Sequence, residues 1–216
     1  MLLVIERERA MGLAALVPSG MDQRLARLRV AIAAAPSIAA GPPATPADVA
    51  AFEAAYGIVL PDEARRFFLE VADGLRLDGE PMLYGLADMR LAQPRSAAPA
   101  RPFPYADPDA EAIRVAIAAA GAGGPLADPR VMGLQRAGDP DGCLILTCNG
   151  GNDFSALVVT GAQRGVMWRT GELDAPECRA LYTPGADDAP LGFLDWIGPW
   201  AACFLGVELD AGASRS

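Results

Sequence analysis

Residues 45–74 have the sequence TPADVAAFEAAYGIVLPDEARRFFLEVADG, and this stretch predicts two short helices joined by a brief link. Thr45 is a good N-cap, Pro46 suits a first helical turn, and Asp48 completes a pair resembling a capping box with Thr45. Gly57 is placed to end this first helix. Its apolar side chains share one face, which must pack against another part of the chain: Val49, Phe52 and Tyr56.

The second half of the stretch repeats the pattern. Pro61 opens a helix, and Asp62 and Glu63 lie in its first turn, where the helix dipole favours negative charge. Gly74 is placed to stop it. The expected buried side consists of Phe67, Phe68 and Val71. Two short capped helices with so brief a link predict a helical hairpin.

The clearest β-strand signal lies in residues 142–171. Three runs are rich in strand-forming residues, namely GCLILTC (142–148), FSALVVTG (154–161) and VMWRTG (166–171). Clusters of Asn, Gly and Asp, or the sequence AQRG, separate them, which predicts an antiparallel meander. Residues 174–190 are expected to form an acidic, proline-containing loop. Helices together with a largely antiparallel sheet place the chain in the α+β class.

Five further segments have recognisable patterns. Residues 21–35 predict an amphipathic helix, with Leu25, Leu28 and Ile32 at helical spacing, and residues 36–44 predict a linker rich in Pro and Gly. Residues 81–86 suggest a short strand, and residues 107–124 a helix with a glycine-rich exit. The closing segment 191–206 predicts a helix that Gly198 and Pro199 should kink; its apolar stripe is Phe193, Trp196, Ile197, Trp200 and Phe204.

Two residue types are missing from the whole sequence. The chain has no histidine, and all 18 of its basic residues are arginine, so it also has no lysine. The usual Ser-His and Cys-His nucleophile pairs are therefore excluded, as are Schiff-base chemistry and a Walker-type phosphate loop. Carboxylate chemistry, a single cysteine, or binding remain open. We expect a protein that is not an enzyme and that needs no cofactor.

The net charge of -9 disfavours direct nucleic-acid binding and favours a basic partner. The sequence contains no run of about 18 strongly apolar residues, so we expect no membrane span. The charged residues 6–9 interrupt the first apolar run, so we expect no export signal. Residues 2–5 could form an edge strand, or Met21 could be the true start. Without export we expect a cytoplasmic protein whose cysteines are reduced.

The order of these elements resembles the SUKH superfamily, which groups fungal Smi/Knr-type cell-wall regulators with bacterial toxin-immunity proteins. The similar pieces are the stretch 45–74, SALVVTGAQRGVMW (155–168) and FLDWIGPW (193–200). The resemblance covers residues 45–206, with an N-terminal segment 1–44 and a tail 207–216 outside it. The insert at 92–128 is long for a minimal member, and Gly198-Pro199 interrupts a helix that is expected to be continuous.

The resemblance implies an α+β fold with helices packed on one side of the sheet. It also implies a cytoplasmic immunity protein that neutralises a cognate toxin, often a nuclease, by direct binding. An alternative is an intracellular regulatory scaffold that binds an endogenous protein, as the fungal members do. Carboxylates presented by an acidic protein could occupy the basic cleft of a nuclease.

Seven residues are candidates for contact with the partner: Asp73, Asp78, Asp153, Trp168, Glu172, Asp187 and Asp188. Solvated turn residues are the ordinary alternative for the carboxylates, because Asp is common in turns. Trp168 could be an interface anchor or a core residue. Asp139 and Asp141 lie in a turn, DPDG, that lacks the other oxygen ligands of a calcium loop. Cys143 and Cys148 should face opposite sides of a strand, so no metal site is expected.

Overall fold

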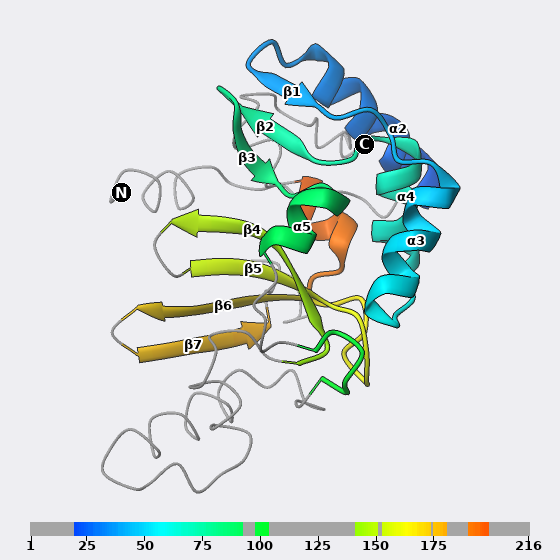
Figure 1. Cartoon of the computed structure of the whole chain (residues 1–216). Helices are drawn as coiled ribbons and strands as arrows, with labels where there is room; N and C mark the ends of the chain where they lie inside the picture. The colour runs from blue at the N-terminus through cyan, green and yellow to red at the C-terminus, as the bar shows by residue number, and fades with distance from the viewer. Residues whose placement is uncertain are drawn as a thin grey trace, which may run out of the picture.

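The computed structural model describes residues 20–92, 98–103, 141–150, 153–173, 175–180 and 190–198. Helices and antiparallel strands are both present among these residues, which confirms the predicted α+β class (Figure 1). The elements in chain order are α2 (Met21–Ala34), β1 (Ile38–Ala40), α3 (Pro46–Tyr56), α4 (Asp62–Glu70), β2 (Leu75–Leu77), β3 (Glu80–Leu83), α5 (Leu86–Ala92), β4 (Cys143–Gly150), β5 (Asp153–Val158), β6 (Met167–Leu173) and β7 (Ala175–Ala180). Residues 193–198 are also helical.

The strands form two antiparallel sheets, one in the order β1-β2-β3 and one in the order β4-β5-β6-β7. The two sheets meet just after β3, where the backbone N–H of Tyr84 donates to the carbonyl oxygen of Leu146 in β4 at 2.8 Å. In Figure 1 the smaller sheet lies above β4, and α3 and α4 lie at one end of both sheets.

The helical hairpin predicted from residues 45–74 is present. Thr45 caps α3 through a reciprocal capping box with Asp48, and Gly57 ends it in the left-handed conformation, with φ +64°. The second helix, α4, ends at Glu70 and not at Gly74, because Val71 is its C-cap. Gly74 instead has φ +88° and lies against Gly85, where an added Cβ would come within 2.7 Å of the Gly85 nitrogen.

Three sequence-based expectations are corrected. The predicted linker 36–44 contains β1, which pairs with β2. The predicted loop 174–190 contains β7, which extends the meander to a fourth strand. The strand expected at 81–86 is the second arm of a hairpin, β2 and β3, and Leu86 already begins α5.

β6 also gains a second neighbour on the edge that β7 occupies. Ala180 of β7 pairs with Trp168, and Gly192 forms a bridge with Val166. The N–H of Met167 donates to the Leu191 carbonyl at 2.9 Å. This edge of β6 is therefore contacted both by Ala180 and by residues 191–192.

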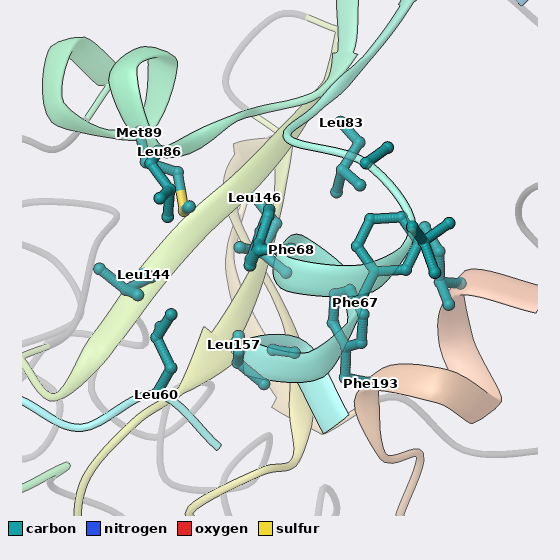
Figure 2. Packing of buried hydrophobic residues seen from close by; sticks show 14 of the residues in the cluster. Leu60, Phe67, Phe68, Leu83, Leu86, Met89, Leu144, Leu146, Leu157 and Phe193 are labelled. Atoms are coloured by element: carbon teal, nitrogen blue, oxygen red, sulfur yellow. The ribbon is translucent and has the colours of Figure 1, made fainter. Parts of the chain in front are cut away.

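The main hydrophobic core lies between the helices and one face of the sheets. Phe67 and Phe68 of α4 are fully buried against the sheet residues Leu146 and Leu157 (Figure 2). Phe193 closes the cluster, with its ring centroid 5.4 Å from that of Phe67. The apolar stripe expected for α2 is buried in the same core, at Leu25, Leu28 and Ile32.

Several expectations lie outside the described residues: the edge strand at 2–5, the helix at 107–124, most of the insert 92–128, Pro199 with the rest of the closing helix, and the tail 207–216. Within the described residues, no helix is long and apolar enough to cross a membrane.

Candidate functional site

The β2–β3 hairpin presents two exposed carboxylates. Asp78 and Gly79 form its two-residue turn with φ +51° and +89°, the positive values that a type I′ turn requires. Asp78 and Glu80 are both exposed. Arg76 donates to the Gly79 carbonyl at 3.2 Å and forms a two-pronged pair with Asp88 at 2.8 and 2.9 Å, which holds the hairpin against α5.

A second group of acidic positions lies at one end of the four-stranded sheet. The register places Asp153 of β5 opposite Gly171 of β6, and Gly171 opposite Glu177 of β7. Glu172 follows Gly171 and lies opposite Pro176. Three strands therefore bring acidic residues to neighbouring backbone positions.

The two groups lie at the same end of the strands. The chain runs along β3 from the Asp78–Gly79 turn toward Tyr84, whose N–H donates to the Leu146 carbonyl of β4. In Figure 1 the arrows of β3 and β4 point in opposite directions, so this turn and the end of β4 at Gly150 lie at the same end of the strands. Figure 1 shows the β2–β3 turn and the end of β4 on the left, opposite α3 and α4. We call this region the acidic end and define it by Asp78, Glu80, Asp153, Glu172 and Glu177.

Most other described carboxylates have arginine partners. Arg66 pairs with both Asp22 and Glu70 at 2.6 Å, and its hydrogen bonds hold the pKa of Glu70 below the usual range. The remaining ion pairs are Arg24 with Glu63 and Asp195, Arg65 with Glu53, Arg76 with Asp88, and Arg101 with Asp141. Among the described residues, Asp78 and Glu80 take part in none of these pairs.

Asp73, a predicted contact residue, uses its carboxylate within the fold. Its half-buried carboxylate accepts a hydrogen bond from the N–H of Leu86 at 2.7 Å, at the start of α5. Burial raises the pKa of Asp73 above its ordinary value, although the Leu86 hydrogen bond opposes this. Asp73 precedes β2 and so lies at the opposite end of that strand from Asp78.

Trp168, the aromatic candidate, is fully buried in β6. Its ring packs edge-on against Phe103 at a centroid distance of 4.8 Å. This position agrees with the core alternative and leaves no side-chain surface for a partner.

Asp187 and Asp188 lie outside the described residues. The segment that contains them is anchored at Ala180 and Pro190, beside the first residues of β6. Its anchors are therefore at the far end of β6 from Glu172. Of the seven predicted residues, Asp153 and Glu172 lie on the paired strands β5 and β6, and Asp78 lies at the same end of the strands in the other sheet.

Sequence reasoning missed Glu80 and Glu177. The Asp-Gly pair at 78–79, between two short apolar runs, is a strong hairpin signal and could have identified Glu80. Glu177 gave no such signal, because APECRA has little strand propensity and contains a proline.

A shallow groove of about 340 Å³ lies at the start of α4, lined by Pro61, Asp62, Glu63, Arg164, Gly165, Val166, Pro190 and Gly192. Two of its three charged side chains, those of Glu63 and Arg164, have structural partners. Glu63 accepts a hydrogen bond from the Leu194 N–H at 2.9 Å, and Arg164 donates to the carbonyls of Val59 and Leu60. The groove therefore offers no converging set of available polar groups.

The residues considered for metal binding are placed as follows. Asp141 of the DPDG turn accepts a hydrogen bond from the Ala98 N–H at 2.9 Å and pairs with Arg101. Cys143 is buried and Cys148 is exposed. Within the described ranges, no group of three or more Cys, Asp or Glu side chains could hold a metal ion.

Comparison with protein-family models found no match for this sequence, and no curated protein matches it.

Proposed function

We propose that this chain is a non-enzymatic protein-binding domain whose acidic end contacts a basic protein. The observation that carries the proposal is the pair of exposed carboxylates of Asp78 and Glu80, which take part in no ion pair among the described residues. Asp153, Glu172 and Glu177 lie at the same end of the strands. Carboxylates without arginine partners attract a basic surface and raise the rate of association.

The partner that we propose is a bacterial toxin, so that the chain acts as a cytoplasmic immunity protein. Two features support this choice: the resemblance of residues 45–206 to the SUKH superfamily, and the net charge of -9. A nuclease that grips phosphate has a basic cleft, which matches an acidic surface in charge.

Co-expression with a toxin encoded by a neighbouring gene tests the biological role. Growth should be restored when this chain is produced. Continued arrest of growth in cells that contain abundant, folded protein would show that the chain does not neutralise that toxin.

Charge-neutralising variants test the surface. Asp78→Asn with Glu80→Gln should slow association with the toxin about two- to tenfold at low salt and flatten its salt dependence. Asn tolerates the positive φ at position 78, so the turn should persist. Association rates are measured by stopped flow or surface plasmon resonance over a range of salt concentrations.

The matched control changes the net charge equally at another surface. Ala51→Arg with Ala55→Arg adds the same charge on the exposed face of α3. The association rate of this variant should depend on salt concentration more nearly as that of the wild type does than the rate of the Asp78→Asn, Glu80→Gln variant. Equal slowing by both variants would mean that net charge, and not the acidic end, governs association.

A further inference from the structure

A guanidinium group lies directly beside the acidic turn of the β2–β3 hairpin. Arg76 donates through Nη1 to the Gly79 carbonyl at 3.2 Å, and Gly79 stands between Asp78 and Glu80 in the chain. Consecutive Cα atoms are about 3.8 Å apart, and the Debye length at 0.1 M salt is about 10 Å. The positive charge of Arg76 therefore acts on both turn carboxylates and, if unbalanced, would offset part of their negative charge.

The carboxylate of Asp88 in α5 balances this cation. Nη2 of Arg76 donates to both oxygens of Asp88, at 2.8 and 2.9 Å. The side chain of Asp88 is only 28% exposed, whereas Asp78 and Glu80 are both exposed. Attraction between opposite charges is stronger where less water surrounds them, which favours pairing with Asp88.

The packing of α5 fixes the position of Asp88. Its neighbours Leu86 and Met89 are buried in the main core, and its carboxylate accepts a hydrogen bond from the Gly85 N–H at 3.4 Å. Pairing with a carboxylate that is already fixed costs less side-chain entropy than ordering one on an exposed turn. The ion pair of Arg76 therefore forms at α5 and not at the turn.

We propose that Asp88 is a positioning residue of the acidic end, which engages the charge of Arg76 and so leaves Asp78 and Glu80 available to a basic partner. The biological meaning of this inference rests on the proposed function, but the charge at the turn can be measured without any partner.

The ionised side chains around the turn predict an order among variants. Arg76, Asp78, Glu80 and Asp88 together carry a charge of -2. Asp88→Asn reduces this to -1, and Arg76→Gln added to Asp88→Asn restores -2. Arg76→Gln alone gives -3. The electrostatic potential at the turn should follow this order.

Paramagnetic relaxation by small charged nitroxides measures that potential residue by residue. A cationic nitroxide concentrates where the potential is negative and an anionic one where it is positive. At low salt, the ratio of the cationic to the anionic effect on amide protons of residues 78–80 should fall about twofold in Asp88→Asn. Asn keeps an oxygen for the Gly85 N–H, so the start of α5 should persist. The double variant with Arg76→Gln should recover the wild-type ratio.

Asp62→Asn is the matched control, because it removes the same charge at an exposed position in the first turn of α4. In Figure 1 this helix lies opposite the hairpin turn. The ratio at residues 78–80 should stay close to that of the wild type. An equal fall in Asp62→Asn and Asp88→Asn would overturn the inference, since net charge alone would then account for it. A ratio that stays low in the double variant would also overturn it, because the loss would not come from Arg76.

Arg76→Gln alone covers the case in which Asp88→Asn loosens the hairpin. Gln keeps a donor for the Gly79 carbonyl, and the ratio at residues 78–80 should rise above the wild-type value. A ratio that this variant leaves unchanged would show that the cation does not act on the turn and would overturn the inference.

Association with the toxin separates this inference from the proposed function. Asp88→Asn should slow association about two- to fivefold at low salt, and the double variant should restore the rate. If the nitroxide ratios follow the predicted order while the association rate stays constant, Asp88 engages Arg76 as inferred, but the acidic end is not the surface that binds the toxin.

Discussion

The carboxylate of Asp73 joins two elements at the level of a single residue. It follows α4 in the chain and accepts the N–H of Leu86, which starts α5. Gly85 is required beside it, since a Cβ there would come within 2.9 Å of the Asp73 carboxylate oxygen. Because burial raises the pKa of Asp73, ionisation of this group opposes folding.

Asp73→Asn and Asp73→Ala should therefore change the free energy of unfolding in opposite directions. Asn keeps an oxygen acceptor and carries no charge, so this variant should be at least as stable as the wild type at pH 7. The pKa of Asp73 is higher in the folded than in the unfolded protein, so the wild type gains stability as the pH falls through the folded-state pKa. The difference in unfolding free energy between Asp73→Asn and the wild type should therefore shrink at lower pH. Ala loses the acceptor and should cost about 1 kcal/mol. Urea unfolding at several pH values measures both, and equal loss in the two variants would contradict this account.

At the scale of elements, α3 owes its start to a local device. The Thr45 hydroxyl accepts the Asp48 N–H at 3.2 Å, and the Asp48 carboxylate accepts the Thr45 N–H at 3.0 Å. Hydrogen bonds from Thr45 lower the pKa of Asp48.

Thr45→Ala should lower the free energy of unfolding by about 1 kcal/mol. The Asp48 N–H loses its acceptor, and the reciprocal hydrogen bond from the N–H of residue 45 to the Asp48 carboxylate is weakened. Ser37→Ala removes a hydroxyl from an exposed turn and should change it by less than about 0.5 kcal/mol. Chemical denaturation of both variants and the wild type measures the two changes in the free energy of unfolding. Similar stabilities would show that the capping box is dispensable.

The elements that were predictable are those specified by their own residues. The capping box, Gly57 and the apolar spacing of α2 and α3 are local signals, and each marks an element that is present. β1 and β7 depend on their partners instead. Ile38–Ala40 becomes a strand by pairing with β2, and β7 tolerates Pro176 as the strand at the end of the sheet order. The acidic end was predicted only in part for the same reason, since Glu177 reaches it through β7.

At the scale of the whole molecule, one core serves both sheets. Leu75 and Leu83 of the smaller sheet belong to the same cluster as Leu146 and Leu157 of the larger one. The Tyr84–Leu146 hydrogen bond lies at the seam between the sheets. We therefore expect the two sheets to unfold together.

Leu146→Ala should cost about 2–5 kcal/mol, the usual range for a fully buried leucine. Hydrogen exchange should accelerate by similar factors in β2 and β5, because both strands contribute residues to the core that the change weakens. Leu91→Ala, at a leucine that is 87% exposed, should have almost no effect. Acceleration confined to β4 and β5 would mean that the sheets unfold separately.

The return of the chain to β6 at Gly192 has a practical consequence for engineering. Since Ala180 and Gly192 pair with residues only two positions apart, Trp168 and Val166, the backbone between them starts and finishes at nearly the same place. The entropy of joining two such fixed points by a chain rises only slowly with the number of residues between them. Residues of an epitope tag or a fluorescent reporter inserted between these two anchors therefore leave the pairing of Ala180 and Gly192 with β6 geometrically possible.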